Sequence, residues 1–224
     1  MEIIARIHTP YKEKFGIPRQ SGITDEIISK IVFVPKYRRP EAFVGLEGYS
    51  HLWIIWEFSE AKRDDWSPTV RPPRLGGNKR MGVFATRSPF RPNPIGLSSV
   101  KIESFEIDNG LGPVIYVRGA DMLDGTPIYD IKPYLPYTDS HPSAQGGFSE
   151  EVMDYSVKVI IDDELLLNVE EKYRKALISI LSQDPRPSYK KDSEKEYGML
   201  FADYEIFFRV KNDALTVTRI NTKV

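Results

Sequence analysis

The stretch IISKIVFV, residues 27–34, is rich in β-branched and aromatic side chains and predicts a β-strand. Around it, short apolar or alternating runs are separated by connections rich in proline and glycine, a pattern typical of β-rich units. With this stretch included, the expected strands are residues 3–8, 28–34, 51–58, 81–86, 98–107 and 114–118. Because no long helical pattern interrupts them, we expect a mainly β fold, a single-sheeted barrel of roughly six strands.

The sequence pattern changes near residue 150, so we expect two domains, residues 1–150 and 151–224. A strand is predicted over residues 155–161. Asp162 or Asp163 then offers a side chain suited to cap a helix, and apolar residues follow at helical spacing.

That helix is expected to end at Asp184-Pro185, because proline disfavours helical geometry in the residue before it. The runs 204–210 and 215–220 then predict a hairpin around Asn212-Asp213. The second domain is therefore expected to be a small β-α-β-β unit.

The composition excludes several classes of protein. The 224 residues contain no cysteine, which excludes disulfides, thiolate zinc sites, iron–sulfur clusters and cysteine nucleophiles. No apolar run reaches the roughly 18 residues that span a bilayer, and the N-terminus lacks the pattern of a signal peptide. His8, His51 and His141 do not have metal-ligand spacing. We expect a soluble, cytoplasmic protein without a catalytic metal.

Charge is balanced over the whole chain but not along it. The 31 basic and 32 acidic residues give a net charge of −1, yet residues 70–102 contain no Asp or Glu. The basic residues of this stretch are Arg71, Arg74, Lys79, Arg80, Arg87, Arg91 and Lys101. Because a bound phosphate senses the nearby field more than the total charge, the stretch is a candidate anion-binding surface.

Residues 86–96, TRSPFRPNPIG, form the most informative segment. Its three prolines fix their own φ angles and bias the preceding residues to extended geometry, so we expect a rigid exposed turn. Arg87 and Arg91 on such a turn suit the recognition of a carboxylate or a phosphate, because little entropy remains to be lost on binding. The alternative is a stiff connection between strands with solvated arginines.

The chain resembles the TrmO (TsaA-like) family. The resemblance rests on VRPPRLGGN at 70–78, GVFAT at 82–86 and the proline-rich turn, and it extends over nearly the whole chain. Further matching runs are IHTPY at 7–11, GIPRQ at 16–20, DMLDGTP at 121–127 and QDPRP at 183–187.

Members of that family are S-adenosylmethionine-dependent tRNA methyltransferases that methylate N6 of threonylcarbamoyladenosine, next to the anticodon at position 37. The resemblance implies a barrel that binds the methyl donor, with a homodimer interface close to the donor site. It also implies a fold without the dinucleotide-binding sheet, and no glycine-rich G-x-G-x-x-G turn follows a strand here.

Carried over position by position, the resemblance implies a donor site on several separate segments. The donor-site residues in this chain would be Pro18, Arg19, Gln20, Phe58, Ser59, Arg87, Leu97, Asp124, Gly125, Thr126 and Pro127. Ser59 stands where many members have a histidine. An arginine suits the donor's carboxylate, and an aspartate suits its ammonium or ribose hydroxyls. Glycine at 125 allows close approach of the backbone. Taken without the resemblance, residues 124–127 are a plain turn sequence and Leu97 is a core residue.

The tRNA side is expected to be cationic. Candidate contacts are Arg71, Arg74, Lys79, Arg80 and Arg91, with Arg186 and Tyr189 offering a guanidinium plane and a ring to anticodon-loop bases. The alternative for the last two is an ordinary helix end followed by a charged loop.

We interpret the reaction as direct in-line displacement of the activated methyl group. The attacking N6 is ureido-like, so removal of its proton would help, and Asp121, Asp124 or Tyr129 could accept it. Arg91 is a candidate for the threonyl carboxylate. Two alternatives stay open, a donor-binding sensor without transfer activity and a methyltransferase that acts on another RNA or on a small molecule.

Overall fold

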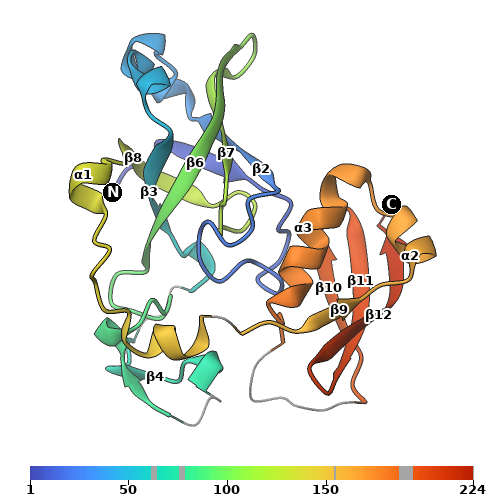
Figure 1. Ribbon diagram of the computed structural model, residues 1–224. Helices are drawn as coiled ribbons and strands as arrows, with labels where there is room; N and C mark the ends of the chain where they lie inside the picture. Colours follow the sequence, from blue (N-terminus) through green and yellow to red (C-terminus); the bar gives the residue numbers. More distant parts are fainter. Residues whose placement is uncertain (62–64, 76–78, 154, 187–193, 224) are drawn as a thin grey trace.

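The computed structural model describes residues 1–61, 65–75, 79–153, 155–186 and 194–223. Figure 1 shows a β-rich body formed by the first part of the chain and a smaller sheet with a helix against it formed by the last part. Among the described residues, no helix is both long and apolar enough to cross a membrane.

The β-rich body is a closed barrel. Its strands are β1 (Ala5–His8), β2 (Ile28–Phe33), β3 (His51–Glu57), β6 (Ile95–Asp108), β7 (Gly112–Arg118) and β8 (Pro127–Pro133). They follow the order β1-β2-β7-β6-β3-β8, with antiparallel neighbours, and β1 pairs with β8 to close the sheet. The expected six-stranded barrel is confirmed.

One expected strand does not belong to the barrel. Of residues 81–86, only β5 (Met81–Gly82) is extended, and it pairs with β4 (Thr69–Val70) in a separate two-stranded ribbon before a 3-10 turn at Val83–Ala85. The sixth barrel strand is instead β8, which was not among the expected strands. Prolines bound β8 at both ends, and a proline is tolerated at the first position of a strand.

Alternate residues of the barrel strands point inward. Ile7, Ile31, Ile54, Ile115 and Ile128 are all completely buried. This alternation follows from the two-residue period of a strand, which places every second side chain on the same face. The barrel is therefore filled by its own side chains.

The C-terminal unit is a four-stranded mixed sheet with helices. Its elements are β9 (Lys158–Ile160), α2 (Asp163–Leu167), α3 (Glu171–Ser182), β10 (Tyr197–Phe201), β11 (Tyr204–Lys211) and β12 (Ala214–Thr222). The sheet order is β10-β11-β12-β9, and β9 runs parallel to β12. The predicted hairpin is confirmed, and Asn212 and Asp213 have the positive φ angles of its tight turn, 50° and 58°.

The helical segment differs from the expected single helix. Of the two predicted candidates, Asp162 caps α2 by accepting a hydrogen bond from the backbone of Glu164. The chain then breaks and restarts as α3, because Val169 is completely buried and draws the connection into the core. The predicted end of the helix before Asp184-Pro185 is confirmed, because α3 ends at Ser182. Strand β10 was not expected.

The connection between β1 and β2 leaves the barrel and joins the C-terminal core. Tyr11 and Ile27 belong to the same buried cluster as α3 and β10–β12, and Phe15 and Ile17 pack against it. The backbone of Ala202 donates to the carbonyl of Pro10 at 2.8 Å. Residues 9–27 therefore lie between the two bodies.

The remaining elements are short. They are the helix α1 (Pro136–Asp139) and 3-10 turns at Pro35–Tyr37, Pro40–Phe43, Leu46–Gly48, Ser59–Ala61, Pro73–Leu75 and Gly147–Val152.

Candidate active site

The proline-rich turn of residues 86–96 is braced by its own polar groups. The Oγ1 of Thr86 donates to the carbonyl of Val83 at 2.9 Å, and the backbone of Phe90 donates to Ser88 Oγ at 3.2 Å. The Nη1 of Arg91 donates to the carbonyl of Thr86 at 2.9 Å, so this half-buried guanidinium helps to hold the turn. The rigid turn is thus built by hydrogen bonds as well as by its prolines.

Arg87 is exposed on this turn and reaches the β1–β2 connection. Its Nη1 donates to Gln20 Oε1 at 2.6 Å. Gln20 in turn donates from Nε2 to the carbonyl of Arg19 at 2.6 Å. The structure therefore brings together Arg19, Gln20 and Arg87, which the sequence resemblance assigned to one site from two distant segments.

Asp121 is held by a relay of side chains from the barrel. Trp56 Nε1 donates to Ser98 Oγ at 2.9 Å, and Ser98 Oγ donates to Asp121 Oδ1 at 2.6 Å. Burial raises the pKa of the Asp121 carboxyl above its usual range, while the Ser98 hydrogen bond, the backbone N–H of Ser21 and the charge of Arg87 offset this only in part. A carboxylate with a raised pKa is the better proton acceptor of the aspartates considered.

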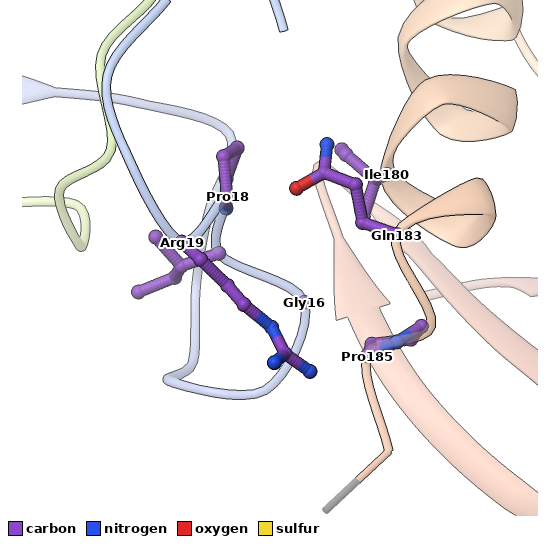
Figure 2. Close-up of a pocket in the computed structure, with 7 residues that line it drawn as sticks. Gly16, Pro18, Arg19, Ile180, Gln183 and Pro185 are labelled. Atoms are coloured by element: carbon purple, nitrogen blue, oxygen red, sulfur yellow. The ribbon is translucent and has the colours of Figure 1, made fainter. Parts of the chain in front are cut away.

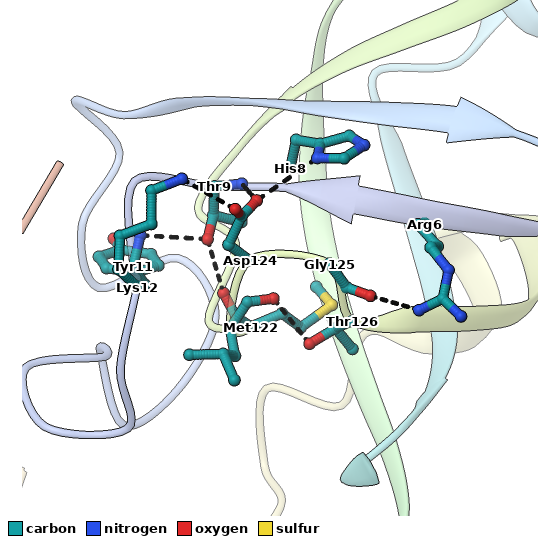
Figure 3. Close-up of polar contacts among 10 residues, drawn as sticks. Arg6, His8, Thr9, Tyr11, Lys12, Met122, Asp124, Gly125 and Thr126 are labelled. Carbon is teal, nitrogen blue, oxygen red and sulfur yellow. Dashed lines mark hydrogen bonds and ion pairs between the residues drawn. The ribbon is translucent and has the colours of Figure 1, made fainter. Parts of the chain in front are cut away.

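Asp124 lies in a different network, which Figure 3 shows. Its Oδ2 accepts from Lys12 Nζ at 2.8 Å, and its Oδ1 accepts from the backbone of Thr9 at 3.1 Å and lies 3.4 Å from His8 Nδ1. Burial alone would raise the pKa of Asp124, but the bonds from Lys12 and Thr9 bring it below the usual value. Asp124 is therefore a weak base, and its carboxylate is occupied within the chain.

The residues after Asp124 form a turn against β1. The Gly125 carbonyl accepts from Arg6 Nη1 at 2.7 Å, and Thr126 Oγ1 donates to the carbonyl of Leu123 at 2.7 Å (Figure 3). Gly125 has φ +78°, and no atom lies within 4 Å of the place a Cβ would take. The turn needs glycine for its backbone conformation rather than for close packing. Pro127 begins β8.

Tyr129 is the third candidate base, on β8. Burial raises its pKa, and a hydrogen bond with Glu57 raises it further. A phenol with a raised pKa is mostly protonated near neutral pH and accepts a proton poorly. Of the three candidates, Asp121 has the environment that best suits a base.

The end of β3 lies against the proline-rich turn. The backbone of Phe58 donates to the carbonyl of Pro94 at 2.8 Å, and the Phe58 ring lies 4.2 Å from the Trp56 ring, centroid to centroid. Ser59 is exposed at the start of the next 3-10 turn. Leu97 lies on the outer face of β6 with 58% of its surface exposed, so it is not a core residue. Phe58 and Leu97 thus flank the turn, while Ser59 is open to solvent.

Pro18 and Arg19 face the C-terminal unit. Figure 2 shows the Arg19 side chain extending toward Pro185, beside a crevice that is also lined by Gly16, Ile17, Pro18, Ile180 and Gln183. The Nη2 of Arg19 donates to the carbonyl of Asp184 at 3.0 Å. The β1–β2 connection is thus held from both sides.

The residues expected to meet tRNA differ in their exposure. Arg71, Lys79 and Arg80 are exposed. Arg186 is buried, and its Nε and Nη2 donate to the two carboxylate oxygens of Asp184 at 2.8 and 2.9 Å. Tyr189 and the side chain of Arg74 lie outside the described residues. Because its guanidinium is engaged inside the protein, Arg186 does not present an open plane to a base.

Two residues of the site carried no sequence signal of function. Ser98 and Trp56 lie in expected strands, and only the pairing of β3 with β6 brings them together. The inward position of a serine in an otherwise apolar strand face was the single available hint. In the described part of the chain, no group of three His, Asp or Glu side chains lies close enough to hold a metal ion.

Two family models match the chain. Residues 6–140 match the model described as the tRNA-methyltransferase O N-terminal domain, and residues 155–223 match the TrmO C-terminal domain. The two matches follow the same order as the barrel and the mixed sheet.

Curated relatives and solved structures agree with these models. The tRNA (adenine(37)-N6)-methyltransferase of Escherichia coli (strain K12) is 42% identical over 225 residues, covering 96% of this chain and 95% of that protein. The protein of the same name from Eikenella corrodens is 44% identical over 164 residues, covering 73% of this chain and 92% of that one. A crystal structure of TrmO from Pseudomonas aeruginosa superposes with a TM-score of 0.78 at 30% identity, covering 98% of this chain and 95% of that one.

The family models match both bodies of the structure, and the Escherichia coli relative and the Pseudomonas aeruginosa structure match over nearly their whole length. The chain belongs to the TrmO family.

Proposed function

We propose that this protein is a tRNA (adenine(37)-N6)-methyltransferase that uses S-adenosylmethionine to methylate N6 of threonylcarbamoyladenosine. The observation that carries the proposal is the hydrogen bond between Arg87 and Gln20, which joins the rigid turn to the β1–β2 connection beside the half-buried Asp121. Membership of the TrmO family and the names of its curated relatives support the same activity.

The side chains at this place fit the proposed cofactor. The exposed guanidinium of Arg87 suits the cofactor's carboxylate, and the amide of Gln20 can both donate to and accept from polar groups. Exposed Leu97 and the Phe58 ring offer apolar surface for an adenine. When bound, S-adenosylmethionine supplies a methyl group that its sulfonium already activates. The contribution of the protein is to align the reacting atoms and exclude water, which can lower a barrier by roughly 7–11 kcal/mol.

We propose that Asp121 accepts the proton that the attacking N6 loses. Its raised pKa makes it a competent acceptor, and Ser98 fixes one carboxylate oxygen while Trp56 fixes Ser98. Asp124 is better suited to hold the turn of residues 124–127 against β1, because Lys12 and Thr9 occupy its oxygens. Gly125, Thr126 and Pro127 remain part of the proposed donor site, where their backbone would contact the donor.

The tRNA surface is proposed to include exposed Arg71, Lys79 and Arg80. These cations lie in the connection between β4 and β5, at one end of the two-stranded ribbon, and together they suit phosphate groups. We keep the domain boundary near residue 150, with the barrel as the donor-binding domain and the C-terminal unit contributing to tRNA binding.

We further propose a homodimer with the donor site near its interface. Large apolar side chains are exposed around the proline-rich turn, namely Trp66, Phe84, Phe90, Ile95 and Leu97. Patches of this kind usually mark interaction sites. Light scattering on the purified protein should give twice the 25.7 kDa mass of the chain, and the mass of a single chain would contradict the dimer.

A transfer assay tests the activity. The purified protein is incubated with methyl-labelled S-adenosylmethionine and one of three acceptors: tRNA carrying threonylcarbamoyladenosine, the same tRNA without the modification, or small-molecule nucleosides. We expect label only in the first, at position 37 by nucleoside mass spectrometry. The Arg87→Ala variant should lose most of this activity, while Arg39→Ala, at an exposed position directly before the 3-10 turn at Pro40–Phe43, should keep it.

Other results identify the alternatives. Tight binding of S-adenosylmethionine without transfer to any acceptor would indicate a sensor. Equal transfer to unmodified tRNA, or transfer to a nucleoside, would indicate a methyltransferase with another substrate. Either result contradicts the proposed function.

A further inference from the structure

The loop that carries the proposed donor residues is anchored to the C-terminal unit on both sides of those residues. Before Arg19, the backbone of Leu200 donates to Glu13 Oε1 at 2.7 Å, and the rings of Phe15 and Phe208 stack with centroids 6.2 Å apart. After it, Gln183 Nε2 donates to Thr24 Oγ1 at 3.2 Å. These contacts join residues far apart in the sequence and fix the loop on both sides of residues 18–20.

The central anchor is the turn at Asp184, directly after α3. Asp184 has φ +49°, a conformation uncommon for a residue with a side chain. Its carboxylate accepts both a two-point contact from Arg186 and a hydrogen bond from Tyr155 Oη at 3.0 Å. The Asp184 and Arg186 side chains are only 8% and 10% exposed. A paired and buried cluster of this kind holds the turn in one conformation.

The carbonyl of the same turn holds Arg19. It accepts from Arg19 Nη2 at 3.0 Å, across the crevice shown in Figure 2. The carbonyl of Arg19 accepts from Gln20, whose Oε1 accepts from Arg87. Continuous hydrogen bonds therefore run from Arg186, through Asp184, Arg19 and Gln20, to the proline-rich turn.

We infer that Arg186 is a positioning residue for the methyl donor: by fixing the Asp184 turn it places Arg19 and Gln20, so the C-terminal unit is part of the donor-binding machinery. The inference rests on the proposed function, because it takes residues 18–20 and Arg87 as the donor site. It replaces the expectation that Arg186 contacts tRNA, since its guanidinium is buried against Asp184.

A double-mutant cycle tests the inference on the full chain. Binding of S-adenosylmethionine is measured by calorimetry for the wild type, Arg186→Lys, Arg19→Ala and the double variant. Lysine keeps the charge but loses the two-point contact. We expect Arg186→Lys to weaken binding roughly three- to tenfold, a usual range for a residue that acts through others. In the Arg19→Ala background, the same change should have no further effect.

The controls separate positioning from loss of structure. Arg174→Lys is the matched variant, because Arg174 lies on α3 and bonds the backbone of Val169, away from the loop. It should bind S-adenosylmethionine like the wild type, and thermal unfolding should show that both lysine variants are folded. Thr24→Val, which removes a second anchor of the loop, should also weaken binding and leave the KM for tRNA unchanged.

Three outcomes would overturn the inference. The first is wild-type donor affinity for Arg186→Lys with a raised KM for tRNA, which would make Arg186 a tRNA contact. The second is an equal loss in both backgrounds, which would show that Arg186 does not act through Arg19. The third is unchanged binding in Arg19→Ala, which would show that the anchor of Arg19 on Asp184 has no part in donor binding. None of the three contradicts the proposed function, which the transfer assay tests separately.

Discussion

At the scale of single residues, Asp121 carries the most specific chemical expectation. Its carboxylate is held by Ser98, which is held by Trp56, and burial raises its pKa. The shift means that the protonated form persists to a higher pH than in an ordinary aspartate, whose pKa is about 3.9. The proposed base is therefore active only above this raised pKa.

Replacing Asp121 by asparagine tests this role. The kcat of the wild type should fall as the pH drops through the raised pKa, because the protonated carboxyl cannot accept the N6 proton. Asp121→Asn should lower kcat about 100-fold or more near neutral pH and lose the acidic limb of the pH profile. Steady-state kinetics with modified tRNA measures both. An unchanged pH profile in the variant, with donor binding intact, would exclude Asp121 as the base.

Tyr11 gives a residue-scale prediction for stability. It is buried in the C-terminal core, and in the described part of the chain its hydroxyl has no hydrogen-bond partner. Since an unpaired buried hydroxyl is costly, Tyr11→Phe should raise the free energy of unfolding by about 1 kcal/mol in urea denaturation. Tyr204→Phe is the matched control, because the Tyr204 hydroxyl accepts from the backbone of Glu170 at 3.1 Å. That variant should lose stability, and an equal loss in both would contradict the argument.

At the scale of elements, the barrel strands show what a sequence can predict. The runs at β1, β2, β3, β6 and β7 were expected because their side chains suit a pleated surface. Strand β8 was not expected, because prolines at both of its ends are typical of loops. Its pairing with β1 and β3 also joins segments distant in sequence. Local patterns predict elements, whereas pairing that closes a sheet depends on contacts between distant segments.

The candidate site divides in the same way. Arg87 could be predicted from its proline-rich turn, and Gln20 only from the family resemblance. The relay from Trp56 to Asp121 depends on strand register, which no local pattern specifies. The sequence context of Arg186 indicated an exposed residue, but the structure buries it. Its burial depends on the pairing with Asp184, which the local context does not reveal.

Gly96 provides the test at this scale, because it determines how β6 meets β3. A Cβ at Gly96 would lie 2.2 Å from Trp56 Cε2, and Trp56 is almost completely buried. Gly96→Ala should therefore displace the indole and cost about 1–3 kcal/mol of stability. It should also lower the rate of methyl transfer, because the displaced Trp56 no longer holds Ser98 against Asp121. Gly48→Ala is the control, since nothing lies within 4 Å of its Cβ position. Urea denaturation with wild-type stability for Gly96→Ala would contradict the packing argument.

At the scale of the whole molecule, the two bodies share the loop of residues 9–27. Its apolar residues lie in the C-terminal core, while Gln20 reaches the turn beside the barrel. The donor site is therefore expected to depend on both bodies. The Asp184–Arg186 pair fixes a turn of the C-terminal unit, and the carbonyl of Asp184 in that turn accepts from Arg19 Nη2 of the shared loop at 3.0 Å.

The stability of this arrangement should depend on pH through Asp184. Burial alone would raise the pKa of Asp184, but hydrogen bonds from Arg186 and Tyr155 lower it below the usual value. A lowered pKa in the folded state stabilises the protein above the unfolded pKa of about 3.9, and this contribution is lost as the pH falls through the folded value. Asp184→Asn should therefore cost roughly 3 kcal/mol at pH 7, and the penalty should shrink below about pH 4. Urea denaturation at both pH values measures it, and a penalty independent of pH would contradict the assignment.

The central claim is that the proline-rich turn and the β1–β2 loop together bind the methyl donor. A crystal structure of the protein with S-adenosylmethionine tests it most directly. We predict the cofactor against Gln20 and Arg87, with its methyl group open to a nucleotide near Asp121. A cofactor bound elsewhere, with Gln20 and Arg87 making no contact to it, would contradict the account.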